Sequence, residues 1–221
     1  MIYAYGICEA TRTPSPADRR GLGGAKLRTL QSGGLAAVYS CHRSLRPQPS
    51  RELILSHEHV VEAMMTRGPV LPLRFGTQLE RPEHLASALE ARREEMMQAL
   101  ERVRGKVELA VRVIPTHSLR TRAAVGEGYG RRYLLARVEE HQRAEQVARD
   151  LHDPLASLAS ESILRERVEP PAIMVGAYLV PTHAVPAFRA SVERVAADNR
   201  DLRVVLTGPW PPYNFATEDR R

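Results

Sequence analysis

Short apolar segments rich in β-branched residues recur along the chain and have the pattern of strands. These segments are residues 2–7, 35–41, 70–74, 107–113, 162–168, 172–180 and 203–207. The segment 70–74 contains Pro72, which has no N–H group to donate to a ladder, so this strand is expected at a sheet edge or a bulge. The sequence therefore predicts a protein built largely from short strands.

Other segments repeat apolar residues every three or four positions, as amphipathic helices do. They are residues 50–66, 82–104, 131–151 and 182–197. Ser50 is expected to cap the first of these helices, and Gly105 is expected to close the second. Residues 11–34 contain several Gly and Pro residues and predict a loop with a short helical turn at 25–30, whereas residues 115–130 are the expected linker.

The order of elements predicts an α+β fold with two α/β domains, residues 1–115 and 116–221. From residue 107 the order is βαββαβ, which is the ferredoxin-like pattern with helices on one face of an antiparallel sheet. The first half reads ββαβαβ and is expected to be a modified version of the same theme.

Composition narrows the class of protein. The chain has 221 residues, 43% of them hydrophobic, with a net charge of +6. Residues 1–115 hold 17 Lys and Arg against 12 Asp and Glu, so this half carries the excess charge. The charges are interspersed and the strands at 70–73 and 107–113 have no aromatic residue for stacking on bases, so no nucleic-acid binding is expected.

Neither a secretory signal nor a membrane-length apolar stretch is visible, which predicts a cytoplasmic chain with no membrane contact.

No catalytic, cofactor-binding or metal-binding residue is predicted. His57 and His59 are two residues apart on an expected helix and point to different faces, so they cannot hold one metal ion; a semi-buried helix histidine is the expected role. The glycine-rich stretches at 21–24 and 126–130 lack phosphate-loop spacing. Cys8 and Cys41 are expected to be free, fairly buried thiols in a reducing compartment.

Two motifs nevertheless contain candidate partner-binding residues. The first is Val70–Thr77, with candidates Val70, Pro72, Arg74, Phe75 and Gly76. A purely structural role is the alternative: Pro72 ends the pairing, Phe75 fills the core and Gly76 makes a turn. Arg74 could bind an anion or pair with a carboxylate of its own fold.

The second motif is the aromatic and proline-rich stretch 207–215, with candidates Trp210, Tyr213 and Phe215. Its three prolines hold it extended. One interpretation is a tail that plugs the end of a core, with Trp210 packed on the second half or between the domains. The other is an exposed aromatic surface that grips a partner.

Together, several motifs resemble the gas vesicle accessory proteins of the GvpF/GvpL family along nearly the whole chain. They are Tyr3–Ile7 (YAYGI), residues 34–38 (GLAAV), His59 with Val60, Val70–Thr77 (VLPLRFGT), residues 107–111 (VELAV), Tyr133 with Leu134, and residues 208–215 (GPWPPYNF). The long Arg- and Pro-rich loop at 11–34 departs locally from the family pattern.

The resemblance implies a non-enzymatic minor component or assembly factor of gas vesicles in the cytoplasm. It also implies contact with the small, very hydrophobic shell protein GvpA and with other accessory proteins, and no cofactor. A shell protein with exposed apolar faces aggregates unless it is covered before assembly, and an apolar groove or sheet edge in residues 1–115 is the candidate surface. A small-ligand-binding or enzymatic ferredoxin-like protein of unknown substrate remains the alternative, because fold does not fix function.

Overall fold

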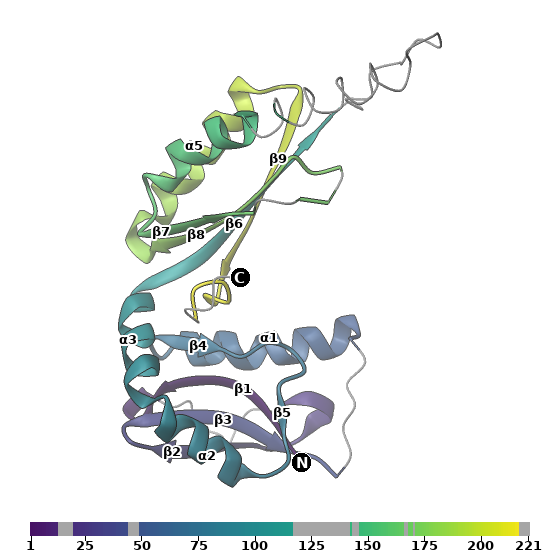
Figure 1. Ribbon diagram of the computed structural model, residues 1–221. Coiled ribbons are helices and arrows are strands. Elements are labelled where there is room, and N and C mark those ends of the chain that lie inside the picture. Colours follow the sequence, from purple (N-terminus) through teal and green to yellow (C-terminus); the bar gives the residue numbers. More distant parts are fainter. Residues whose placement is uncertain are drawn as a thin grey trace, which may run out of the picture. The chain divides into compact units, whose positions relative to one another are not determined.

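The computed structural model describes residues 1–12, 20–43, 49–116, 142, 146–165, 168–169 and 171–216. They form two compact units, Met1–Glu108 with Pro209–Arg221, and Leu109–Gly208. Each unit has its own sheet and its own helices (Figure 1), so the predicted α+β fold with two α/β domains is confirmed. The predicted linker at 115–130 and the first part of the predicted helix at 131–151 lie largely outside the described residues.

The sheet of the first unit has the strand order β2-β3-β1-β4, and β5 also pairs with β1. Its strands are β1 (Ile2–Glu9), β2 (Leu27–Ser32), β3 (Leu35–Cys41), β4 (Val70–Pro72) and β5 (Gln78–Leu79). All of their pairings are antiparallel. Pro72 lies opposite Gly6 in the outer strand β4, so the predicted edge position of this segment is confirmed.

Strand β2 corrects the predicted loop and helical turn within residues 11–34. Its last residue, Ser32, pairs with Leu35 across a two-residue turn, in which Gly33 and Gly34 have φ angles of 57° and 87°. Two successive positive φ angles define the tight turn that matches the twist of a hairpin, and glycine adopts them at little cost. The two glycines therefore make a hairpin instead of ending an irregular loop.

The described residues of the first unit also form three α-helices. Helix α1 (Arg51–Met65) begins as predicted, with the Ser50 hydroxyl accepting the Leu53 N–H at 3.3 Å. The single helix predicted at 82–104 is wrong: α2 (Pro82–Ala91) and α3 (Arg93–Val103) are separated at Arg92, whose φ is −117°. The break lets α2 contact β2 while α3 contacts β1 and β4. One straight helix of that length could not make both sets of contacts. Gly105 ends the run as predicted, with a φ of 66°.

A β-bulge in β1 shapes the core of the first unit. The register against β3 shifts between Ala4 and Gly6, so Tyr3, Tyr5 and Cys8 all belong to one buried cluster. The side chains of α1 that pack in this cluster are Val60, Val61 and Met64. Helix α1 is thus fixed on the face of β1 that bears both tyrosines.

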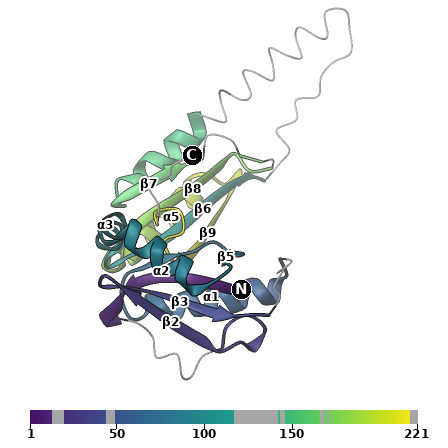
Figure 2. The same ribbon diagram turned by 60° about the horizontal axis from the view of Figure 1, so that its bottom comes forward.

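The second unit has the ferredoxin-like arrangement. Its sheet has the strand order β7-β8-β6-β9, with β6 (Lys106–Pro115), β7 (Glu161–Leu164), β8 (Met174–Pro181) and β9 (Leu202–Trp210). Helical residues 146–156 and α5 (Val185–Asp198) supply Leu151, Leu155, Phe188 and Val192 to a single cluster with Tyr178, so both helices cover the same face of the sheet (Figure 2). The predicted βαββαβ pattern is confirmed.

Strand β9 is longer than the predicted segment 203–207 and continues through Pro209 to Trp210. Proline is tolerated there because β9 is an outer strand of its sheet, where a missing N–H group need not break a ladder. The chain passes from the second unit back to the first between Gly208 and Pro209. The residues that follow therefore belong with the first unit.

Candidate functional site

His57 is the centre of a buried polar network in the first unit. It lies on α1 with no exposed surface. Its Nε2 is 3.0 Å from the carbonyl oxygen of Leu73, and its Nδ1 is 2.9 Å from the hydroxyl of Tyr3. A carbonyl can only accept, so Nε2 carries the proton and Nδ1 accepts from the tyrosine. Burial lowers the pKa of His57 to about 4, which keeps the ring neutral at neutral pH.

The two tyrosines of β1 extend this network in different directions. The Tyr3 hydroxyl accepts the Gly76 N–H at 3.0 Å, and burial raises the pKa of Tyr3 to about 12. Tyr5 stacks on the His57 ring with a centroid distance of 5.5 Å. Its hydroxyl accepts the Leu22 N–H at 2.8 Å and lies 2.8 Å from the Ser40 hydroxyl. Alternate residues of one strand thus anchor two separate loops.

The segment Leu73–Thr77, called here the Arg74 turn, is held at both ends. Leu73 N–H donates to the Tyr5 carbonyl at 2.9 Å, and Ala4 N–H donates to the Thr77 carbonyl at 3.0 Å. Thr77 closes the turn by donating its N–H and its hydroxyl to the Arg74 carbonyl. Gly76 has a φ of 93°, a backbone conformation that is strained for a residue with a side chain. Backbone groups of Leu73, Arg74, Gly76 and Thr77 are therefore all held by hydrogen bonds.

The candidates of the Val70–Thr77 motif are divided between core and surface. Val70 and Pro72 are buried, and Val70 belongs to the central cluster. Phe75 is half-buried at the edge of that cluster, with its ring 6.1 Å from Tyr3 and 5.9 Å from His57. It lies at the rim of the core, not inside it as expected.

Arg74 is exposed on this turn. Within the part of the chain that the structure describes, its guanidinium has no hydrogen bond and no ion pair, so the alternative of a carboxylate partner in its own fold is not observed.

The C-terminal segment, Pro209–Ala216, packs on the first unit. Tyr213 donates its hydroxyl to Glu58 at 2.8 Å, and Asn214 donates its N–H and its side-chain amide to Glu108 at 2.9 and 2.5 Å. Arg102 donates to the Phe215 carbonyl, and the Phe215 ring is only 1% exposed. Figure 1 shows this segment in yellow beside α1.

The sequence-based division placed this segment in the domain 116–221, whereas its contacts group it with the first unit. Its hydrogen-bond partners come from α1, α3 and the start of β6, all in the first unit. Trp210 keeps 38% of its surface exposed, so its ring is not enclosed as the plug interpretation required. Of the three aromatic candidates, Phe215 is the one that is buried as a plug.

Glu58 connects the C-terminal segment to the His57 network. The Tyr213 ring lies 6.5 Å from the His57 ring, and its hydroxyl donates to the carboxylate of the next residue, Glu58. Burial raises the pKa of Glu58, and its second oxygen, Oε2, is buried with no hydrogen-bond partner among the described residues. Burial and the neighbouring carboxylate also raise the pKa of Tyr213. The contact brings the end of the chain against the helix that carries His57.

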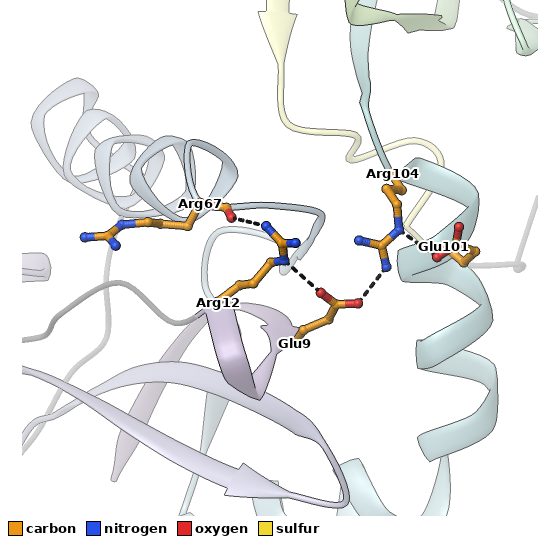
Figure 3. A network of polar contacts seen from close by, with 5 residues as sticks. All are labelled: Glu9, Arg12, Arg67, Glu101 and Arg104. Carbon is orange, nitrogen blue, oxygen red and sulfur yellow. Dashed lines mark hydrogen bonds and ion pairs between the residues drawn. The ribbon is translucent and has the colours of Figure 1, made fainter.

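A second polar network fixes the end of β1 (Figure 3). Glu9 accepts from Arg104 at 2.6 Å and from Arg12 at 3.2 Å, and Arg104 also pairs with Glu101 at 2.7 Å. Arg12 donates to the Arg67 carbonyl at 3.3 Å, beyond the end of α1. The hydrogen bond from Arg104 lowers the pKa of Glu9. This network ties the C-terminal ends of α1 and α3 to one strand.

Sequence reasoning identified the turn and the C-terminal motif but missed the tyrosines and His57 as a group. The available signals were the spacing of Tyr3 and Tyr5 on one face of a strand and the place of His57 on the apolar stripe of its helix. His59, which the family resemblance singled out, is exposed. Among the described residues, no three His, Cys, Asp or Glu side chains are grouped to hold a metal ion, and no helix is long and apolar enough to cross a membrane.

Comparisons with known proteins agree with this arrangement. The family model described as gas vesicle synthesis protein GvpL/GvpF matches residues 1–217. Gas vesicle protein F1 of Halobacterium salinarum is 26% identical over 218 residues, covering 97% of this chain and 92% of that protein. Gas vesicle protein L of a Streptomyces species is 29% identical over 248 residues, covering 98% and 92%.

Solved structures support the fold. The crystal structure of the gas vesicle protein GvpF from Anabaena sp. PCC7120 matches with a TM-score of 0.78 at 22% identity, covering 100% of this chain and 97% of that one. The structure of GvpF from Microcystis aeruginosa matches equally well, with a TM-score of 0.78 at 21% identity, covering 98% of each chain.

Proposed function

The chain belongs to the gas vesicle synthesis protein GvpL/GvpF family, and we propose that it is a non-enzymatic assembly factor that binds the shell protein GvpA while gas vesicles form. The match of the family model to residues 1–217 carries this proposal, because it spans both units and the C-terminal segment. Membership gives the chain an accessory role in gas vesicles. Binding of GvpA, contact with other accessory proteins and a place at the vesicle in the cytoplasm are the finer parts of the proposal.

The chemistry of the described network supports a binding role over catalysis. His57 is the histidine at the centre of this network, yet it has no exposed surface and both ring nitrogens are engaged. A general base must reach a substrate within hydrogen-bond distance. The network instead fixes a turn and a helix, which is what a rigid binding surface requires.

The physical task of such a factor follows from its partner. A small, very hydrophobic shell protein exposes apolar surface before it is assembled, and such surface aggregates unless it is covered. We propose that the first unit provides the cover. It contains Ile54 and Leu55, two large apolar side chains of α1 that are 39% and 46% exposed.

Co-expression tests this function directly. A tagged full-length chain should retain GvpA from the same source in the soluble fraction and carry it through affinity purification. The matched control is the same tag on an unrelated protein of similar size. GvpA that stays in the pellet and never co-purifies would contradict the proposal. In the source organism, loss of the gene should abolish gas vesicles, and the wild-type gene should restore them.

A further inference from the structure

We propose that Arg74 and the first two turns of α1 form one docking surface for a partner segment that carries a carboxylate beside apolar side chains. The inference rests on the proposed function, since the partner is the protein that this accessory factor binds. It goes beyond that function by naming the residues that make the contact and the chemistry that they select.

The position of Arg74 beside α1 follows from its two neighbours in the chain. The carbonyl of Leu73 accepts from His57 at 3.0 Å, and the ring of Phe75 packs 5.9 Å from the ring of the same histidine. Arg74 lies between these residues and must therefore be next to the turn of α1 that contains His57. Ile54 precedes His57 by three residues and is one helical turn away.

The apolar part of the surface continues along the helix from the C-terminal segment. Tyr213 is bonded to Glu58, and Ile54 lies four residues before Glu58 on the same side of α1. Half-buried Phe75 and Tyr213 both pack against His57 from outside the helix. Ile54 is 39% exposed, so the described residues leave this side of α1 uncovered at its first turns.

The charged part of the surface is the guanidinium of Arg74. It has no hydrogen bond and no ion pair among the described residues. The backbone that presents it is fixed by the hydrogen bonds of the Arg74 turn, so little backbone order is lost when a partner binds. Guanidinium groups pair with carboxylates through two parallel hydrogen bonds, and the pair is stronger beside apolar surface that excludes water. The complementary group is thus a carboxylate at the edge of an apolar face.

Charge reversal in the full-length chain provides the first test, with co-expressed GvpA as the probe. Arg74→Glu should weaken GvpA binding by about tenfold or more, the loss typical of a central contact residue. Arg28 is an exposed arginine on β2, at the other edge of the sheet. Arg28→Glu makes the same charge change and should alter binding by no more than about twofold. The melting temperature should be the same for both variants, because neither side chain has a partner within the described fold.

An apolar pair of variants provides the second test. Ile54→Asp should weaken binding of GvpA by about tenfold, as expected for loss of an apolar contact together with repulsion of the partner carboxylate. Met97, on α3, is exposed to a similar extent at 36%, and Met97→Asp is the matched control.

The outcomes separate this inference from the proposed function. If wild-type protein binds GvpA and Arg74→Glu binds equally well, the docking surface is wrong and the function stands. If the wild-type protein retains no GvpA, both fail. A loss in Arg74→Glu that an Asp→Arg or Glu→Arg change in GvpA restores would identify the complementary carboxylate.

Discussion

His57 makes the stability of the first unit depend on pH. Its pKa is lowered by burial to about 4 from an ordinary value of 6.5. Below pH 6.5 the unfolded chain binds a proton that the folded chain does not accept until about pH 4. The stabilising contribution is therefore complete above pH 6.5 and is lost as the pH falls toward 4, by at most about 1.4 kcal/mol per pH unit. The raised pKa of neighbouring Glu58 acts in the opposite direction and offsets part of this loss.

Urea unfolding at pH 7.5 and pH 5 measures the effect. His57 alone should account for a loss of roughly 2 kcal/mol of unfolding free energy between these values, measured as the difference in pH dependence between the wild type and His57→Gln. His57→Gln should flatten the pH dependence, even though it lowers stability at both values. His59→Gln, a change at an exposed histidine on the same helix, should leave the slope unchanged. An equal slope in the wild type and His57→Gln would show that another group controls the acid response.

The Tyr3 hydroxyl is a second group on which the stability of the first unit depends. It donates to His57 and accepts from Gly76, so Tyr3→Phe removes the partner of the buried His57 Nδ1 and of the Gly76 N–H. We expect a loss of about 1–3 kcal/mol in unfolding free energy, the usual cost of unsatisfied buried polar groups. Tyr39→Phe is the control, because the Tyr39 hydroxyl has no hydrogen bond within the described residues. Equal effects of the two substitutions would contradict the network.

At the scale of elements, periodicity predicted most of the strands and helices but not their exceptions. Helix α1 was predicted within two residues because its cap and its apolar stripe agree. Strand β2 was missed because its hairpin depends on two glycines, which also occur in loops. The separation of α2 and α3 could not be predicted from the sequence, because the residues around Arg92 are good helix formers. The break accompanies the packing of the two helices on different strands.

The β2–β3 hairpin allows a test at this scale. Gly34 has a φ of 87° and open space around its Cα, so alanine there meets no neighbour and the cost is conformational. We expect Gly34→Ala to lower unfolding free energy by about 1–2 kcal/mol, the penalty for a left-handed residue with a side chain. Ala25→Gly, in the preceding loop, provides a comparison at a position with a negative φ. A Gly34→Ala variant as stable as the wild type would show that the turn adjusts freely.

At the scale of the whole molecule, the candidate site could be predicted only in part. Each motif could be recognised in the sequence by itself, but the contacts between the motifs could not be predicted. Asn214 and Glu108 are 106 residues apart, and Tyr213 and Glu58 are 155 apart. Neither spacing leaves a local pattern in the sequence. Which unit receives the C-terminal segment is decided by these long-range hydrogen bonds.

Truncation tests this assignment. Removal of residues 209–221 leaves Glu58 and Glu108 without the donors from Tyr213 and Asn214, and it uncovers the surface under Phe215. All of these groups belong to the first unit. Hydrogen exchange should therefore accelerate in α1 and α3 much more than in α5 and β8, because local opening follows the loss of local contacts. Removal of residues 217–221 alone controls for the shorter chain. Faster exchange confined to α5 and β8 would instead indicate that the segment packs on the second unit.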